Sequence, residues 1–286
     1  MAGKYLKKKP RRKKSGAGTL VLLIFFLGVM LFSGWKLIAS QREYEQGSQT
    51  YESLAQSVVT RTEPKKEPPV TQMEVTILPP ETQQEQEAPV QEQTPAAPAE
   101  LVVDFDVLTA INKDIVAWIS ADDGVINYPV VHGSDNDYYL NHLVDGTVNK
   151  NGSIFVDFRH ARGFTDRNTF IYGHNMLNGT MFANLSLYGT AGYYEQHRSL
   201  ELVTPDRSYS LQVFSGYVTP GNSDIYQLTY RDDEDFAQYL EKVRLLSDFT
   251  SDVEVTAQDR IVTLSTCTYD YEDARYILHC KLVPMQ

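Results

Sequence analysis

An uncharged, apolar segment near the N-terminus constrains this chain more than any other feature. It runs from Gly16 to Trp35 and reads GAGTLVLLIFFLGVMLFSGW. A helix of about 20 such residues spans roughly 30 Å, which is the thickness of the hydrocarbon core of a bilayer. Trp35 and Lys36 suit the interface beyond it, where an indole ring and a lysine side chain are stable. The sequence therefore predicts a transmembrane helix over residues 16–36.

The residues before this segment predict its orientation. Eight of the 26 Lys and Arg residues lie within the first 17 positions, with no acidic residue among them. Because basic clusters stay on the cytoplasmic side, residues 1–15 are expected to form a cytoplasmic tail and the chain after Lys36 to be extracellular. The alternative is a cleaved signal peptide, but its apolar region usually has only about 7–15 residues. Ile38-Ala39-Ser40 is a poor cleavage site, so we expect a single-pass anchor.

The remainder of the chain is acidic. Once the eight N-terminal cations are set aside, 18 basic residues stand against all 37 acidic ones, a formal charge of −19 over residues 18–286. This argues against nucleic acid as a partner, because its binding depends on neutralising phosphates. The cysteines, Cys267 and Cys280, lack zinc-site spacing, and no nucleotide motif is present, so no metal and no cofactor is expected. A disulfide between the two cysteines is possible.

A change in composition divides the extracellular part. Eight of the thirteen prolines fall between Pro64 and Pro98, among many Glu, Gln and Thr residues. Such a stretch cannot bury enough apolar surface to offset its conformational entropy, so residues 37–100 are predicted to form an extended extracellular stalk. The apolar spacing within residues 41–60 would tolerate a short amphipathic helix. The globular domain is expected over residues 101–286.

The globular part is predicted to be mainly β. A helical pattern over residues 105–115 opens it, with Asp104 or Asp106 near the N-cap. A second, amphipathic helix is predicted over residues 232–249, with acidic residues early and basic residues late. Many short strands with one long inserted helix predict a closed or nearly closed β-barrel. The predicted strands cover residues 116–119, 126–131, 153–157, 168–172, 200–204, 209–217, 260–266 and 276–283.

The segment from Ile261 to Thr268 carries the most informative chemical pattern. Strand alternation puts Cys267 at the strand end, on the same face as Ser265, where a loop can expose it. If the next strand pairs with this one, Arg275 returns close to Cys267. A guanidinium there can stabilise a thiolate and a developing oxyanion. On spacing alone, however, a cysteine at a strand end is more often a small buried hydrophobe.

A cysteine nucleophile also needs a partner that transfers protons, usually histidine. Six histidines compete for this role. His174 follows the predicted strand 168–172 through Gly173, which permits a tight turn that lifts the imidazole off the strand end. His279 lies on the same strand face as Arg275 and is a rival on local grounds. The residues alone leave both histidines open.

Three separate motifs at these positions resemble those of the sortase family, most closely class B. They are Thr263-Leu264-Ser265-Thr266-Cys267, Tyr172-Gly173-His174 and the downstream Arg275. The segments 126–130 and 136–141 and the predicted helix 232–249 are also similar to class B segments. The resemblance covers roughly residues 101–283.

The resemblance implies a closed eight-stranded β-barrel with N-terminal helices packed against it. It also implies a cysteine transpeptidase that cuts a C-terminal sorting signal of secreted proteins after Thr. The enzyme then passes the protein, held as a thioester, to an amine of a peptidoglycan precursor or crossbridge. Carried over, Cys267 is the nucleophile, His174 the acid and base, and Arg275 the group that orients the substrate and stabilises the oxyanion.

The resemblance further implies which residues bind the sorting signal. Ser265, Asn136 and Leu140 match positions that line the signal-peptide groove of class B relatives, and Tyr226, just before the inserted helix, is added to them. The identity of the sorting motif is not implied.

Other functions compete with this one. An L,D-transpeptidase carries its cysteine in a Ser/Thr-x-Gly-Cys motif, whereas Thr266 precedes Cys267 here. A papain-like hydrolase has Cys before His, the reverse of the order here. A non-catalytic, stalked surface adhesin would fit the anchor and the acidic body equally well. A pilin-polymerising sortase would use a lysine on another subunit as the acceptor amine.

Overall fold

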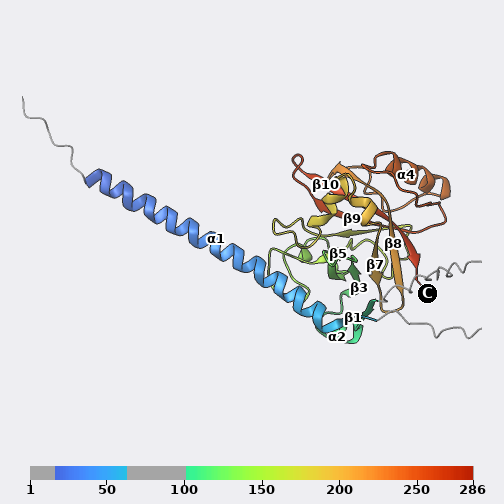
Figure 1. Ribbon diagram of the computed structural model, residues 1–286, viewed down its shortest axis with the longest axis horizontal. Coiled ribbons are helices and arrows are strands. Elements are labelled where there is room, and N and C mark those ends of the chain that lie inside the picture. Colours follow the sequence, from blue (N-terminus) through green and yellow to red (C-terminus); the bar gives the residue numbers. More distant parts are fainter. Residues whose placement is uncertain (1–16, 63–100, 286) are drawn as a thin grey trace, which may run out of the picture.

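The computed structural model of the chain describes residues 17–62 and 101–285 (Figure 1). The predicted basic tail over residues 1–15 and residues 63–100 of the predicted stalk lie outside the described residues. Within them, one long helix leads into a barrel of short strands, and a second long helix, α4, covers part of the outside of that barrel (Figure 1).

Eight strands close into a barrel, which confirms the predicted fold class. Neighbouring strands pair in the order β10-β8-β7-β3-β4-β5-β6-β9, with β4–β5 and β6–β9 parallel and the other pairs antiparallel. Closure removes the exposed sheet edges that an open sheet would leave. The strands are β3 (Ile115–Ser120), β4 (Asn127–Val131), β5 (Ile154–Val156), β6 (Asn168–Tyr172), β7 (Ser199–Val203), β8 (Ser208–Pro220), β9 (Ile261–Cys267) and β10 (Ala274–Pro284).

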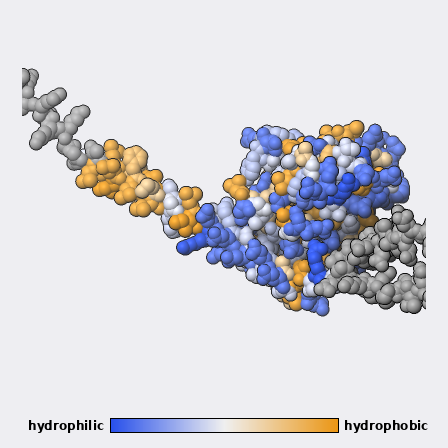
Figure 2. Space-filling view, in the orientation of Figure 1, coloured by the Kyte–Doolittle hydropathy of each residue, from blue (hydrophilic) through white to orange (hydrophobic). Residues whose placement is uncertain are grey.

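The first helix, α1 (Ala17–Val58), is continuous and longer than the predicted span. Among the described residues it is the one helix long and apolar enough to cross a membrane, and its most apolar stretch is not buried in the protein. Figure 2 shows these hydrophobic residues along the rod that projects from a largely hydrophilic domain. The helix passes through the poor cleavage site at Ile38-Ala39-Ser40 without a break.

In the structure the compact domain begins within α1, before residue 101, where the globular domain was predicted to begin. Tyr51, Leu54 and Val58 of α1 are buried in the main hydrophobic core, which also contains the barrel strands. The apolar spacing noticed within residues 41–60 is therefore the face with which α1 packs on the barrel. The compact domain includes the last turns of α1, which the sequence analysis had placed in the stalk.

Two short strands outside the barrel add to this difference. β1 (Val59–Arg61) follows α1 directly and pairs antiparallel with β2 (Leu101–Val103), with Val59 opposite Val103. The amide of Asp104 also donates to the carbonyl of Val58, at 2.9 Å. Arg61 and Leu101 are therefore held beside each other, at the two ends of the range that lies outside the described residues.

The remaining helices follow from their caps and apolar faces. α2 (Phe105–Ile111) begins at Asp104, whose carboxylate accepts two amide hydrogen bonds, and it is shorter than predicted because Ile115 already belongs to β3. α4 (Asp233–Leu245) is the predicted inserted helix, capped by Asp232. Its apolar residues lie in a second cluster with residues from β8, β9 and β10. The shorter helices are η1 (Tyr138–Leu140), η2 (Ala183–Gly189) and α3 (Tyr193–Gln196).

Candidate active site

Strand order brings three distant segments to one rim of the barrel. β6 and β9 are parallel neighbours, with Tyr172 beside Ser265, so their C-terminal ends emerge together. His174 follows β6 and Cys267 ends β9. β10 runs back antiparallel to β9 and puts Arg275 directly opposite Cys267. Residues in such a pair have Cα atoms about 4.5–5.5 Å apart and side chains on the same face.

The turn after β6 requires glycine. A Cβ atom on Gly173 would lie 2.4 Å from Ile154 Cδ1 and 2.8 Å from the ring of Phe182. The Gly173 carbonyl accepts from Thr266 Oγ1 at 2.8 Å, which ties the turn to β9. Gly173 thus leaves room for the side chains of Ile154 and Phe182, and His174 follows it at the mouth of the cavity.

His174 is held by a backbone carbonyl on the opposite side of the site. Its Nε2 lies 2.7 Å from the carbonyl oxygen of Leu140. Because a carbonyl only accepts, Nε2 carries the hydrogen and donates it. Nδ1 is therefore the ring nitrogen left to exchange protons with a reacting group.

The two cysteines differ completely in environment. Cys267 is exposed and free, and its carbonyl accepts from Asn175 Nδ2 at 2.9 Å, which fixes the end of β9. Cys280 is free and fully buried in the main core, and burial raises the pKa of its thiol. It pairs with Val262, five residues from Cys267 along β9. The possible disulfide between the two cysteines is therefore not formed.

The rival histidine does not belong to the site. His279 of β10 is fully buried among β8, β9 and α4, where its ring contacts Thr263 Oγ1 at 2.9 Å and the Tyr217 hydroxyl at 3.1 Å. Burial lowers the pKa of His279 to about 3, so the ring stays neutral. Its role is that of a hydrogen-bonded core residue.

A cavity of about 360 Å³ joins the predicted residues. This is the size range of small-ligand and peptide-side-chain sites. All seven predicted site residues line it, namely Cys267, His174, Arg275, Ser265, Asn136, Leu140 and Tyr226.

The cavity wall contains an ordered tyrosine. The Tyr226 hydroxyl lies 2.9 Å from Ser265 Oγ. Burial raises the pKa of Tyr226, and the Ser265 hydroxyl and the Arg275 charge offset this only in part. The phenol therefore remains protonated and available as a hydrogen-bond donor. On the other side, the Arg275 guanidinium lies 2.9 Å from the Asp273 carboxylate.

Several cavity residues were not predicted from the sequence. Arg159 could have been suspected from its position just after a strand, together with its ion-pair partner Asp157. Asn175 does not line the cavity but contacts the Cys267 carbonyl, and could have been suspected from its place after His174. Tyr172, Gly173 and Thr266 belong to the motifs quoted above but were not assigned to the site, whereas Phe155 and Gly221 are neighbours in space alone. The unpredicted lining residues are Phe155, Arg159, Tyr172, Gly173, Gly221 and Thr266.

Arg159 is fixed by a buried carboxylate. Its guanidinium contacts Asp157 at 2.8 Å and 2.6 Å, and the Tyr172 hydroxyl donates to the same carboxylate at 3.0 Å. Burial alone would raise the pKa of Asp157, but the hydrogen bonds from Arg159 and Asn136 outweigh it and lower the pKa to about 2. This network supports one wall of the cavity.

The Asp157 network predicts acid-dependent stability. Because the pKa of Asp157 is lowered on folding from 3.8 to about 2, its charge stabilises the fold above about pH 4. That stabilisation, roughly 2 kcal/mol, is lost as the pH falls through about 2. In thermal unfolding followed by circular dichroism, we expect Asp157→Asn to lower the Tm at neutral pH, and the difference to vanish in acid. Asp252→Asn, at an exposed ion pair, is the control; a pH-independent Tm difference for Asp157→Asn would contradict the prediction.

Comparisons with known proteins agree with this geometry. A family model described as a sortase domain matches residues 119–283, which is more than half of the chain. The chain belongs to the sortase family. It is 34% identical to sortase B of Listeria monocytogenes, over 92% of this chain and 95% of the relative. It is 38% identical to sortase B of Staphylococcus aureus, over 63% of this chain and 74% of the relative.

Solved structures give the same family. The structure of a Staphylococcus aureus sortase B–substrate complex has a TM-score of 0.61 and 38% sequence identity, covering 64% of this chain and 85% of that one. The resemblance to class B seen in the sequence is thereby confirmed. Sortases are cysteine transpeptidases of the cell surface that act on substrate proteins and amine nucleophiles, and this chain is an enzyme of that kind.

Proposed function

We propose that this sortase cuts a C-terminal sorting signal of secreted proteins after Thr and transfers the new C-terminus to a peptidoglycan amine, with Cys267 as nucleophile. The observation that carries the proposal is the convergence of Cys267, His174 and Arg275 on one cavity from three separate segments. A non-catalytic surface adhesin would have no need of this convergence.

The first half-reaction forms a thioester. Nδ1 of His174 takes the proton of the Cys267 thiol as the sulfur attacks the carbonyl carbon of the Thr residue, and a tetrahedral oxyanion forms. As that intermediate collapses, the C–N bond breaks and the leaving amine takes a proton from His174. The exposure of Cys267 at a strand end supports this role, since a peptide carbonyl can reach the sulfur.

The second half-reaction releases the product. An amine attacks the thioester carbonyl, and His174 takes the proton from that amine. The C–S bond then breaks, and His174 returns the proton to the sulfur, which regenerates the thiol. The ring contact to Leu140 supports the proton role, because it leaves Nδ1 free while fixing the orientation of the imidazole.

Arg275 is proposed to stabilise the oxyanion and to orient the sorting signal. Its register opposite Cys267 and its incomplete use of five N–H donors support this. Ser265, Asn136, Leu140 and Tyr226 are proposed to bind the signal. Their shared lining of the cavity and the substrate-complex relative support the assignment.

The basic residues before α1 support a cytoplasmic N-terminus with the catalytic domain outside the cell. In that orientation the enzyme meets secreted proteins still held at the membrane. The acceptor would then be an amine of a peptidoglycan precursor or crossbridge.

A peptide panel tests the function. Full-length enzyme in detergent is mixed with fluorogenic peptides that differ in the residues before Thr, with and without an amine acceptor. We expect cleavage after Thr for one motif, and a product whose mass contains the acceptor. A product formed only with a lysine side chain of another protein would favour a pilin-polymerising sortase. Binding without cleavage across the panel would contradict the proposal in favour of an adhesin.

A further inference from the structure

The C-terminal half of α1, here called its outer half (residues 38–58), meets the barrel at a glycine. Gly47 is buried against the connection between β4 and β5, and a Cβ atom there would lie 2.5 Å from Asn151 Nδ2 and 2.8 Å from Asn149 Oδ1. Gly34, on the same helix, has no atom of the described residues within 4 Å of such a Cβ atom. Glycine at position 47 thus allows a close approach, at a cost in helix propensity of about 1 kcal/mol.

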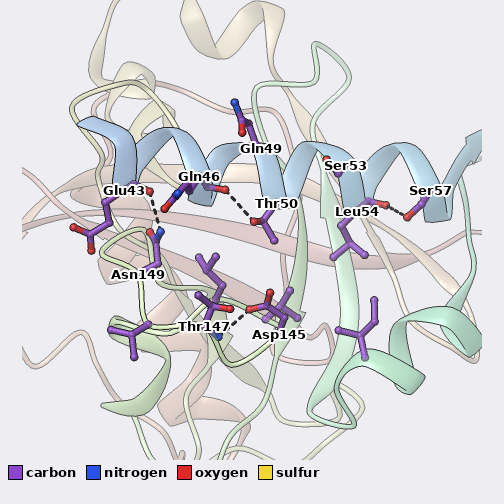
Figure 3. A pocket seen from close by; sticks show the side chains of 14 residues that line it. Glu43, Gln46, Gln49, Thr50, Ser53, Leu54, Ser57, Asp145, Thr147 and Asn149 are labelled. Carbon is purple, nitrogen blue, oxygen red and sulfur yellow. Dashed lines mark hydrogen bonds between the residues drawn. The ribbon is translucent and has the colours of Figure 1, made fainter. Parts of the chain in front are cut away.

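Two buried asparagines hold the helix in this seat. Asn149 Nδ2 donates to the Glu43 carbonyl at 2.8 Å, and Asn151 Nδ2 donates to the Tyr44 carbonyl at 3.2 Å. Lys150 adds an ion pair of 2.9 Å with the Glu43 carboxylate. Figure 3 shows the Glu43–Asn149 contact within α1, where the helix lies over the connection.

The next turns of the helix reach the same connection. The Tyr51 hydroxyl donates to the Gly152 carbonyl at 2.6 Å and lies 3.0 Å from Ser153 Oγ. Between these contacts, α1 and residues 143–149 border a cavity of about 840 Å³ (Figure 3). Direct hydrogen bonds between α1 and the connection therefore lie around Gly47 and Tyr51, on either side of part of this cavity.

The connection passes this constraint to the active site. Gly152 has a φ of +57°, and a Cβ atom there would lie 2.6 Å from the Tyr139 carbonyl oxygen and 2.8 Å from that of Leu140. The Ser153 amide donates to the Tyr139 carbonyl at 2.9 Å, and Ser153 Oγ donates to the His142 carbonyl at 2.9 Å. Residues 149–153 therefore form the support on which residues 139–142 rest.

The last contact in this series is the one that orients the proposed proton carrier. The Leu140 carbonyl accepts from His174 Nε2 at 2.7 Å. Three segments are thus connected in series. Asn151 bonds to α1, residues 152 and 153 lie against the carbonyls of Tyr139 and Leu140, and the Leu140 carbonyl bonds to His174.

We propose that the outer half of α1, seated at Gly47 against Asn151, positions His174 for the transfer reaction. The inference rests on the proposed function, since it assigns the helix to the same reaction. Gly47 and Asn151 touch no reacting atom and act through the Leu140 carbonyl. Displacement of a catalytic group by about 1 Å can cost up to about a hundredfold in rate, so a small shift of residues 139–142 is sufficient.

The test compares two glycines of one helix in the full-length chain. Gly47→Leu forces a side chain into Asn151, whereas Gly34→Leu adds the same side chain in open space and is the matched control. Asn151→Ala removes the contact to α1 without a collision, and thermal unfolding of each variant checks that it is folded. If Gly47→Leu fails to fold, Asn151→Ala carries the test.

Two readouts separate positioning from general stability. The first is the imidazole signal of His174 in protein labelled with 15N-histidine, assigned by its loss in His174→Gln. The second is the separation of kcat from KM in peptide cleavage. For Gly47→Leu and Asn151→Ala we expect loss of the protected Nε2–H signal and a kcat lower by roughly ten- to a hundredfold, with KM changed far less.

The outcomes are distinct. Folded Gly47→Leu and Asn151→Ala proteins that keep the wild-type His174 signal and kcat would overturn the inference. A wild-type enzyme that cleaves no sorting peptide would contradict the proposed function instead, and the His174 signal would still report on positioning. Equal losses in Gly34→Leu would trace the effect to the helix in general and would also overturn the inference.

Discussion

Replacement of Cys267 by alanine is expected to lower kcat/KM for peptide cleavage by at least about a thousandfold, because the thioester route then has no nucleophile. Alanine removes only the sulfur, and the side chain is exposed at the end of β9, so the fold should tolerate the change. The measurement is initial rates with the fluorogenic sorting peptide, and mass spectrometry for the acyl-enzyme, which should be absent.

The second cysteine provides the control. Cys280→Ala removes the same atom from the barrel core, where Cys280 is fully buried. It should lower the Tm but leave the rate per folded molecule close to that of the wild type. A thiol reagent should accordingly modify Cys267 and not Cys280 in the native protein. Wild-type turnover by Cys267→Ala would eliminate the proposed mechanism.

His174→Gln is expected to lower kcat by a factor of about a hundred or more, since general acid–base catalysis typically contributes that much. Glutamine keeps an amide N–H that can donate to the Leu140 carbonyl, so it tests proton transfer with little change in the contact itself. The kinetics of cleavage and of transfer to an amine should both slow, because the same ring serves the leaving and the entering amine.

His197→Gln is the matched control for that prediction. The His197 ring also contacts a backbone carbonyl, that of Tyr193, at 2.8 Å, but it lines a different cavity. Its kcat should stay within about twofold of the wild type. If His174→Gln retained similar activity, another group would have to carry the proton.

The barrel could be predicted largely from local patterns. Alternation within residues 261–267 and 276–283 gave two strands whose faces the structure confirms, with Val262 and Cys280 in the main core and Ile261 and Ile277 beneath α4. The inserted helix was recognisable because its apolar period and terminal charges agree. Local sequence determines such features because side-chain direction is fixed by backbone period.

Contacts between distant segments could not be predicted in this way. Periodicity did not show which of His174 and His279 belongs to the site, since both lie in or next to predicted strands. The burial of His279 in the structure decides it. The family resemblance did make that distinction. Neither source pointed to the Leu140 carbonyl as the partner of His174, because any residue offers a carbonyl.

The position of α1 was missed for a related reason. A composition rich in proline and glutamine describes residues 63–100 but does not say where its two ends lie. The antiparallel pairing of Val59 with Val103 is a contact between residues 44 positions apart, which no local pattern encodes. The compact unit therefore begins within α1, ahead of the proline-rich stretch.

Because β1 pairs with β2, the length of the segment between them does not determine how far the barrel lies from α1. In a tether, the number of residues sets how far an enzyme stands from the bilayer. If the apolar part of α1 crosses a membrane, α1 alone sets that height, because it is continuous from the apolar segment to the residues that pack on the barrel. In that case, insertions, deletions or proteolytic cuts between residues 63 and 100 would leave the barrel at the same height above the lipid.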